Sequence, residues 1–348
     1  MTHRMKIGRK RLLAKTLFLC MMLALLSGCG GQSGGESSGE SGGESGGGTS
    51  GGTLYLNIGT GPSTGMYYSY GTAMGELWNK YIDNIAVTAQ SSNAGAHNIA
   101  LMDSGDVDIG FCVSGIVNYA VNGTNSFEGK PHPNLRAGAY FMDSIVQFVV
   151  SKDSGIEHIS DLVGKRFIPG ANNSGAEIAV REIFDALGMS YSDMSVEFVN
   201  FDGAVERISN GQADAAAIFS SAPVSSVMQL CSTANCKIIT LTQDELDTII
   251  AKYPWYAPKC IPANTYENQP EDVWCVNQTN WICYDASLDT ELVYQMTKLL
   301  YEKTDELVEM CAAASAISKE STVAVLDTLP CEFHPGAAQY FKEIGIID

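Results

Sequence analysis

Short apolar runs alternate with segments of helical periodicity from residue 53 to the end of the chain. Eight runs have the length and composition of buried strands, and they lie at residues 54–60, 85–90, 107–113, 144–151, 165–170, 196–201, 215–220 and 237–242. Between and after them, apolar residues recur every three to four positions at residues 67–81, 178–187 and 291–310. Strands that alternate with such helices predict an open α/β sheet.

The length of this part of the chain predicts two lobes. About 295 residues follow the first fifty, which is more than one hydrophobic core usually organises. Residues 102–111 and 208–219 share a pattern, in which the end of a helix is followed by a glycine turn, an aspartate and a buried strand. We interpret the two segments as equivalent corners of two similar lobes, although such common corners can also resemble each other by chance.

The first 28 residues have the features of a targeting segment. Six basic residues and no acidic one accompany an apolar run at residues 16–26, which is shorter than the roughly 20 residues that span a bilayer. The run ends in Leu26-Ser27-Gly28-Cys29, and small residues before a cysteine suit the bacterial lipoprotein pathway. We expect residues 1–28 to be a lipoprotein signal peptide and Cys29 to carry the lipid. An ordinary signal peptide with an incidental cysteine is the alternative.

A tether and an acidic domain follow this predicted anchor. Residues 29–52 are almost wholly Gly, Ser and Glu, a composition typical of a flexible linker. Removal of residues 1–28 changes the formal charge from −18 to −24. Nucleic-acid binding needs a basic surface, so we expect no nucleic-acid partner. We expect an extracytoplasmic protein, held on the cell membrane by its lipid, at the outer face or in a periplasm.

The cysteines after the predicted lipid site suggest disulfides, which export from the cytoplasm permits. Eight cysteines follow Cys29. Their spacing makes three pairs candidates, namely Cys231–Cys236, Cys275–Cys283 and Cys311–Cys331. Spacing alone does not determine connectivity.

Three loops that follow predicted strands are rich in glycine and in polar side chains. They lie at residues 59–65, 91–98 and 169–177. Glycine lets a backbone approach a ligand, and free N–H groups at a helix N-terminus favour an anion. In open α/β sheets such loops lie at the carboxyl ends of strands, where ligands bind. We expect the ligand-binding residues to be Thr60, Gly61, Ser63, Thr64, Tyr67, Asn93, His97, Asn98, Ser114, Ser174, Gly175, Ala176, Ser220 and Ser221.

Two of these loops also have other interpretations. Ser174 and Glu177 match a capping box, which stabilises a helix with or without a ligand. Gly59, Gly61 and Gly65 resemble a dinucleotide fingerprint, but the next strand ends without the acidic residue that a ribose hydroxyl needs. We therefore expect no cofactor.

Patterns for catalysis and metal binding are missing from the sequence. There is no G-x-S-x-G elbow and no H-E-x-x-H motif. No Cys/His spacing is typical of zinc. We therefore expect neither an enzyme nor a metal site.

At these loops the chain resembles the TAXI-type solute receptors of TRAP transporters, over essentially all of residues 53–348. The similarity rests on the order and spacing of five motifs: Gly59-Thr60-Gly61 with Gly65 and Tyr67-Tyr68; Ser154-Gly155-Ile156 with Asp161-Leu162 and Gly164-Lys165-Arg166; Asn173-Ser174-Gly175-Ala176-Glu177; Tyr253-Pro254 with Ile261-Pro262-Ala263-Asn264-Thr265-Tyr266; and His334-Pro335-Gly336-Ala337 with Tyr340. Two stretches, 94–98 and 113–115, depart from the family pattern. The identity of the ligand is therefore left open.

The resemblance implies an α/β fold, a two-lobed periplasmic-binding-protein clamshell of type II-like arrangement with a chain crossover between the lobes. Under it, we expect residues 53–143 and 255–348 to form lobe 1 and residues 144–254 to form lobe 2. It also implies a solute-binding lipoprotein that captures a small carboxylate, such as a glutamate-like amino acid or another organic acid, for a TRAP-type membrane permease. A ligand-sensing receptor domain and a clamshell-fold enzyme that resembles thiamine-pyrimidine synthases are the alternatives.

Overall fold

The computed structural model describes residues 52–61, 63 and 65–348. The predicted signal peptide, Cys29 and residues 29–51 of the predicted tether lie outside the described residues. The strands are β1 (Leu54–Gly59), β2 (Ile85–Gln90), β3 (Ile109–Val113), β4 (Leu135–Ser151), β5 (Arg166–Ile168), β6 (Ser195–Val196), β7 (Ala215–Ser220), β8 (Cys236–Ile238), β9 (Tyr256–Ile261) and β10 (Val273–Asp285). The α-helices are α1 (Met66–Tyr81), α2 (Ala96–Ser104), α3 (Ser114–Asn122), α4 (Gly175–Leu187), α5 (Phe201–Ser209), α6 (Ser225–Thr233), α7 (Gln243–Lys252), α8 (Thr290–Glu302), α9 (Thr304–Met310), α10 (Lys319–Ala324) and α11 (Pro335–Glu343).

The alternation of strands and helices is confirmed, although the run predicted at 144–151 is only the end of the longer β4, and other segments also differ. The predicted strand at 196–201 is almost absent, because the Asn200 side chain accepts a hydrogen bond from the Gly203 amide and starts α5. The predicted helix at 291–310 is divided at Lys303 into α8 and α9. Strands β9 and β10 were not predicted. The sequence of β10 does not have the pattern of a buried strand, because polar residues interrupt its apolar residues.

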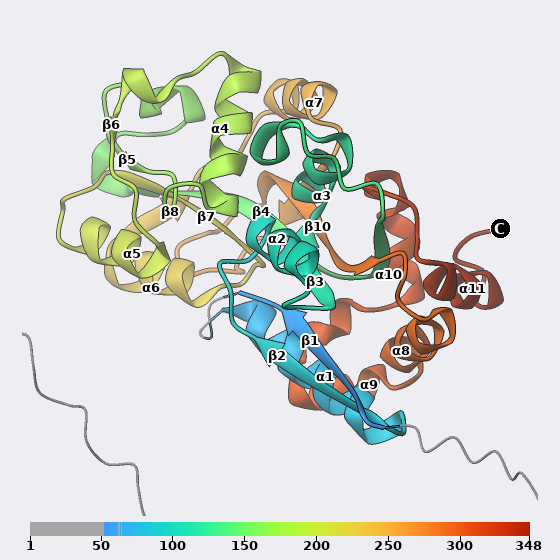
Figure 1. Ribbon diagram of the computed structural model, residues 1–348. Coiled ribbons are helices and arrows are strands. Elements are labelled where there is room, and N and C mark those ends of the chain that lie inside the picture. The colour runs from blue at the N-terminus through green and yellow to red at the C-terminus, as the bar shows by residue number, and fades with distance from the viewer. Residues whose placement is uncertain (1–51, 62, 64) are drawn as a thin grey trace, which may run out of the picture. The chain divides into compact units, whose positions relative to one another are not determined.

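One mixed sheet connects all ten strands, in the order β2-β1-β3-β10-β4-β7-β5-β6, with β8 paired to β4 and β9 to β10 (Figure 1). β1 is parallel to β2 and β3, and β5 is parallel to β6 and β7. β4 and β10, with 17 and 13 residues, are antiparallel to their neighbours and cross from one half of the sheet to the other. We call the part around β1–β3 the first half and the part around β5–β7 the second half.

Each half has its own apolar core, packed on opposite ends of the two long strands. Met142 on β4 and Ile282 on β10 pack with α1, α8 and α11 in the first half. Val146 on β4 and Val276 on β10 pack with α4 and α7 in the second half. Tyr256 on β9 also belongs to the core of the second half. The lobe limits 53–143, 144–254 and 255–348 stay a prediction, and we propose that the last limit lies within β10.

Two matched corners confirm that segments 102–111 and 208–219 are equivalent. In each, a glycine with positive φ closely follows the end of a helix, Gly105 with +75° after α2 and Gly211 with +68° after α5. An aspartate then lies directly before the third strand of that half. Asp108 Oδ2 accepts the Asn57 amide of β1 at 2.8 Å, and Asp214 Oδ2 accepts the Arg166 amide of β5 at 2.9 Å. The aspartate therefore fastens the third strand to the first in both halves.

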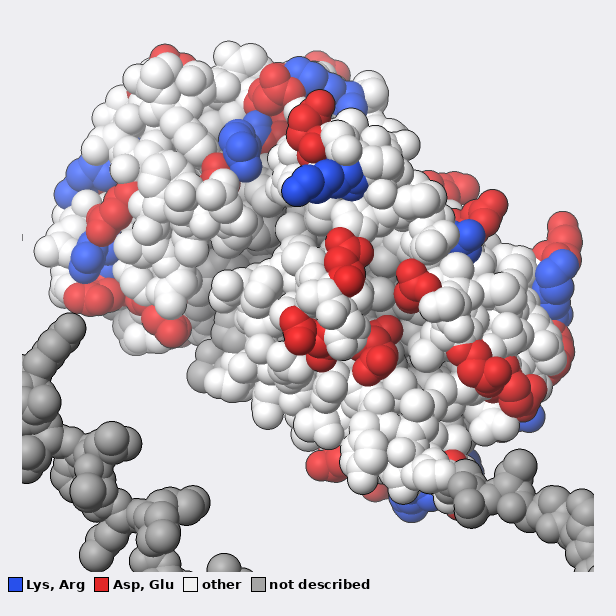
Figure 2. Space-filling view, viewed as in Figure 1, with Lys and Arg blue, Asp and Glu red and all other residues white. Residues whose placement is uncertain are grey.

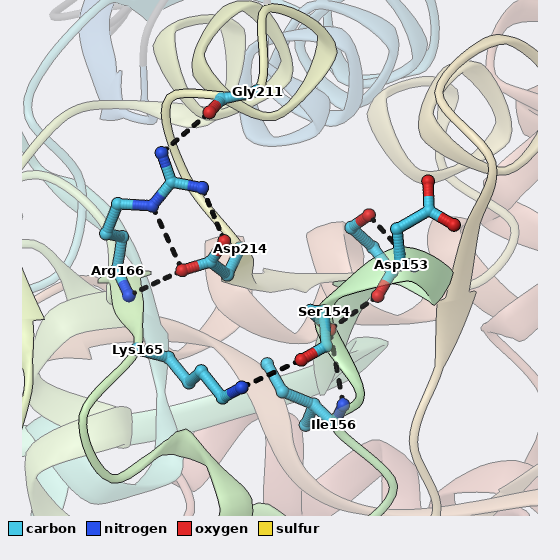
Figure 3. Close-up of polar contacts among 8 residues, drawn as sticks. Asp153, Ser154, Ile156, Lys165, Arg166, Gly211 and Asp214 are labelled. Atoms are coloured by element: carbon cyan, nitrogen blue, oxygen red, sulfur yellow. Dashed lines mark hydrogen bonds and ion pairs between the residues drawn. The ribbon is translucent and has the colours of Figure 1, made fainter.

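The second corner also explains one of the family-like motifs (Figure 3). The Arg166 guanidinium donates to both carboxylate oxygens of Asp214 and to the Gly211 carbonyl. The neighbouring Lys165 ammonium donates to the Ser154 carbonyl at 2.8 Å. These contacts lie at the amino-terminal ends of β5 and β7. The segment from Ser154 to Arg166 therefore shapes the second half at the edge opposite its strand carboxyl ends.

One candidate disulfide is excluded by the fold. Cys275 and Cys283 lie on the same strand, eight residues apart. A strand rises about 3.3 Å per residue, so their Cα atoms are roughly 26 Å apart. A disulfide needs Cα atoms within about 7 Å. The prediction of this pair was therefore wrong. Cys231 and Cys236 lie in one apolar cluster but are free thiols, and Cys311 and Cys331 are free as well, so the other two predicted disulfides are not formed in the structure.

Replacement of Asp214 by Asn should lower stability at neutral pH but not in acid. The hydrogen bonds from Arg166 hold the pKa of the Asp214 carboxyl below its usual value. Such a group stabilises the fold above its unfolded pKa of roughly 3.9 and loses that contribution as pH falls through its folded pKa. Because the pair is partly exposed, we expect a loss of about 1 kcal/mol at pH 7 that becomes smaller as pH falls below about 4 towards the folded pKa. Urea unfolding from pH 7 to pH 3 measures this, with Arg166→Met as the second variant; a difference independent of pH would contradict the assignment.

Candidate functional site

The carboxyl ends of the parallel strands in both halves face one junction. The junction is where β4 and β10 pass between the halves, at residues 143–145 and 277–280. Val113, the last residue of β3, pairs with Asn280. Ser220, the last residue of β7, pairs with Ile145, which also pairs with Asn277. Because β1 and β2 run parallel to β3, and β5 and β6 to β7, the loops after all these strands meet here.

The molecular surface is hollowed on the side where these loops meet. Figure 2 shows the hollow between the part of the surface formed by α5 and α6 and the part formed by α1 and α2. In this view uncharged residues form most of its rim. The predicted ligand-binding residues lie on the loops or helix starts on the two sides of the junction, except that Thr64 lies outside the described residues.

Thr60 and Asn98 support the loops of the first half from within. Both side chains are fully buried. The Thr60 hydroxyl donates to the Gln90 carbonyl at 2.7 Å. The Asn98 amide donates to the carbonyls of Thr60 and Phe111 at 2.8 and 2.9 Å, and its oxygen accepts the Ser92 hydroxyl. These bonds join the ends of β1, β2 and β3. A direct contact of Thr60 or Asn98 with a ligand stays a prediction.

The other predicted residues of the first half differ in exposure. Ser63, Asn93 and His97 are exposed, and His97 Nδ1 accepts a hydrogen bond from the backbone amide of Asn93 at 3.1 Å. Gly61 is buried, with Tyr67 and Ala94 nearby. Ala94 has a positive φ of +59°, an uncommon conformation for a residue other than glycine. Such local strain is concentrated at ligand-binding loops.

Ser114 and Tyr67 are tied to the two long strands and to the segment before β9. The buried Ser114 hydroxyl donates to the Trp255 carbonyl at 3.2 Å. The Tyr67 hydroxyl donates to Asn280 Oδ1, whose amide nitrogen donates to the Met142 carbonyl at 2.9 Å. Burial raises the pKa of the Tyr67 phenol, so this hydroxyl remains a donor at neutral pH. Tyr67 therefore joins the first turn of α1 to the junction.

Sequence reasoning missed the polar residues of the junction itself. Four consecutive residues of β10, Asn277 to Asn280, are polar and buried in a strand that is otherwise largely apolar. Gln278 Oε1 accepts the Gly115 amide at 3.1 Å, and Asn277 donates to Asp143 on β4 at 2.9 Å. This run of polar residues between apolar ones was the available signal, because buried polar groups need a partner.

The loop after β5 presents free amides at the start of α4. Ser174 Oγ accepts the Glu177 amide at 3.2 Å, which confirms the cap. The reciprocal half of the capping box is not formed, because the Glu177 carboxylate contacts Arg181 at 3.1 Å instead. Among the described residues, the amides of Gly175 and Ala176 have no hydrogen-bond acceptor. Two free N–H groups at the positive end of a 13-residue helix favour an anion.

The loop after β7 is held by two residues that the sequence reasoning also missed. Gln147 donates to the Ser220 and Ser221 carbonyls at 3.4 and 3.3 Å. Its oxygen accepts the Tyr266 hydroxyl at 2.6 Å, and that hydroxyl also accepts the Val224 amide at 3.1 Å. Ser220 and Ser221 themselves are half-buried at the end of β7.

The arginines of the two halves are all engaged with protein acceptors. Arg136 donates to the carbonyls of Pro133 and Leu135, Arg181 contacts Glu177, Arg207 contacts Glu197, and Arg166 contacts Asp214. An anion at the junction would therefore meet backbone amides and hydroxyls and no free arginine, and Lys259 at the junction is paired with Asp143.

The strand order and the site define the class of fold. In each half three parallel strands are followed by a long antiparallel strand that arrives from the other half, β10 in the first and β4 in the second. This is a mixed α/β periplasmic-binding-protein fold of type II, with the chain crossover that we expected. The sequence pattern of the NMT1-like family matches residues 58–345, and the chain belongs to that family.

Several solved structures are similar to the chain at low identity. The periplasmic aliphatic sulphonate binding protein SsuA from Escherichia coli is 14% identical, with 83% of each chain covered and a TM-score of 0.48. The alkanesulfonate-binding protein SsuA from Xanthomonas axonopodis pv. citri is 14% identical, with 80% of this chain and 84% of that chain covered and a TM-score of 0.42. A variant of ArgBP from T. maritima is 13% identical, with 76% and 94% covered and a TM-score of 0.44. The ligand of this chain does not follow from these similarities.

Within the described residues, no helix combines the length and the apolar character needed to cross a bilayer.

Asn98→Ala should be far more destabilising than Asn93→Ala, although both change an asparagine of the same loop. The first change removes two donors from buried carbonyls and one acceptor from Ser92, and we expect a loss of roughly 1–3 kcal/mol in unfolding free energy. The second removes an exposed side chain, and we expect a change within about 0.5 kcal/mol. Urea unfolding of both variants measures the difference. Equal losses would contradict the supporting role of Asn98.

Proposed function

We propose that this protein is an extracytoplasmic solute-binding protein that captures a small carboxylate between its two halves. The observation that carries the proposal is the opposition of two sets of strand-end loops across one junction, with the free amides of Gly175 and Ala176 on one side. Backbone amides at a helix start bind carboxylates well. A glutamate-like amino acid or another organic acid suits such a site.

The proposal includes a membrane permease of the TRAP type as the partner. The five motifs that resemble TAXI-type receptors support this. Two lie in the strand-end loops after β1 and β5, one lies in the corner of the second half, one runs through β9, and one opens α11. We propose that the protein does no chemistry on the ligand, since its sequence has no motif for a nucleophile or a metal. A bound ligand that is converted to product would favour an enzyme instead.

Ligand binding should raise the melting temperature, because a ligand that binds only the folded state stabilises it by mass action. The protein should first be unfolded and refolded to remove any co-purified ligand. A thermal-shift screen of amino acids and small organic acids should then give at least one hit. A screen without a hit would count against the proposal.

Gly175→Pro then tests the free amides against Gly175→Ala. Proline is tolerated at the first position of a helix, and the preceding Ser174 already has the extended backbone that proline requires, with ψ of 163°. The proline removes one N–H, so we expect roughly a tenfold to hundredfold weaker affinity in calorimetry. The alanine keeps the N–H, and its Cβ would lie 3.9 Å from Phe219 in ordinary contact, so affinity should be retained. Equal affinities for both variants would place the carboxylate elsewhere.

We further propose that Cys29 carries the lipid that anchors the protein. Cys29→Ser should release the protein from the membrane fraction, because the acylated thiol is the only attachment in this proposal. Fractionation of cells followed by immunoblotting measures the change, with Cys20→Ser, in the predicted signal peptide, as the control. Unchanged retention of the Cys29→Ser variant in the membrane fraction would refute the anchor.

A further inference from the structure

A buried carboxylate lies where the two halves touch. Glu182, in the middle of α4, is 4% exposed and accepts three hydrogen bonds. The donors are the Tyr119 hydroxyl at 2.6 Å, the Tyr256 hydroxyl at 2.6 Å and Trp255 Nε1 at 3.2 Å. Burial raises the pKa of the Glu182 carboxyl, and the hydrogen bonds from Tyr119, Tyr256 and Trp255 oppose this effect. Because all three groups donate to it, the carboxylate is satisfied in its ionised form.

Glu182 lies in the second half, and only one of the two tyrosines that donate to it, Tyr119, comes from the first half. Tyr256 packs in the core of the second half, the same half that contains α4. Tyr119, on α3, packs in a cluster with Ile99 and other residues of the first half. The Tyr119–Glu182 bond therefore connects the two halves, whereas the Tyr256–Glu182 bond lies within one of them.

The same two helices begin at the proposed ligand site. α4 starts with the free amides of Gly175 and Ala176, and Glu182 follows two turns later. α3 starts at Ser114 at the end of β3, and Tyr119 follows five residues later. Ile178, in the first turns of α4, packs with the first-half cluster (Figure 1 shows the start of α4 near α2). A movement that separates α3 from α4 would therefore open both the ligand site and the Tyr119–Glu182 contact.

We propose that Tyr119 and Glu182 form a latch that holds the two halves closed and positions the start of α4 for the ligand. This inference rests on the proposed binding function. The latch is reversible for a physical reason: when the halves separate, Glu182 loses only one donor and keeps Tyr256 and Trp255. Opening exchanges the Tyr119 bond to Glu182 for water, together with the Ser114 bond to the Trp255 carbonyl. The carboxylate keeps two donors, which avoids the strongly unfavourable state of a buried charge without partners.

Tyr119→Phe and Tyr256→Phe are a matched pair of tests, because each removes one hydroxyl from the same carboxylate. Small-angle X-ray scattering of the ligand-free protein measures the separation of the halves. Tyr119→Phe should increase the radius of gyration relative to wild type, since the phenyl ring keeps its packing on Trp255, with ring centroids 5.1 Å apart, but no longer holds Glu182. Tyr256→Phe should leave the radius of gyration unchanged. An unchanged Tyr119→Phe curve, or an equal increase in both variants, would overturn the latch.

The ligand found in the thermal-shift screen gives a second readout. A smaller closed population weakens apparent affinity in proportion, so Tyr119→Phe should bind roughly tenfold or more weakly, and Tyr256→Phe should bind close to wild type. The scattering result does not require a ligand. If the screen gives no hit but the scattering changes as expected, the binding function is rejected and the latch is kept. If the screen gives a hit but the scattering does not change, the latch alone is rejected.

Discussion

Each of the two long strands contributes side chains to both hydrophobic cores, and the rest of the structure depends on this. β4 and β10 are apolar at both ends, where each end packs with helices of a different half. At the middle of both strands the side chains are polar and mostly buried, among them Ser144 on β4 and Asn277 to Asn280 on β10. Because the cores lie on either side of this polar segment, the two halves can be separate bodies on one continuous sheet.

The polar segment also determines what faces the junction. Asn280 and Gln278 are held by Tyr67 and by the Gly115 amide, so the first turns of α1 and α3 are fixed to the long strands. Every such bond satisfies a buried group that would otherwise cost roughly 1–3 kcal/mol. Among the described residues, the groups without a partner at the junction include the backbone amides at the start of α4 and the buried Asn277 Oδ1. Recognition by these amides needs no arginine, which agrees with the engagement of the four arginines of the two halves elsewhere.

The two halves share an architecture but contribute different groups to the contact between them. The Asp108 and Asp214 corners are the same device, an aspartate that fastens the third strand of each half to the first. The helices that follow the strands differ: α4 carries a buried carboxylate, and α3 carries the tyrosine that meets it. We infer that this difference turns a repeated architecture into a pair of halves that can close on each other.

The sequence alone determined the elements and the loops. Apolar periodicity, the glycines after strands and the aspartates at the two corners are local signals, because each acts through neighbours along the chain or through backbone conformation. They predicted the α/β class, most strands, and the loops that carry Thr60, Asn98, Ser174 and Ser220. Even the equivalence of the corners was visible, since both corners need the same residues at the same spacing.

Tertiary structure decided which of those residues support the loops and which remain free. Thr60 and Asn98 look like ligand contacts in the sequence, yet their polar atoms meet carbonyls of β2 and β3 from distant parts of the chain. Glu182 reads as one more charge on an amphipathic helix, and its partner Tyr119 lies 63 residues away. A hydrogen bond depends on where its partner lies in space, and sequence spacing does not record that position. This is why the loops could be predicted and the contacts could not.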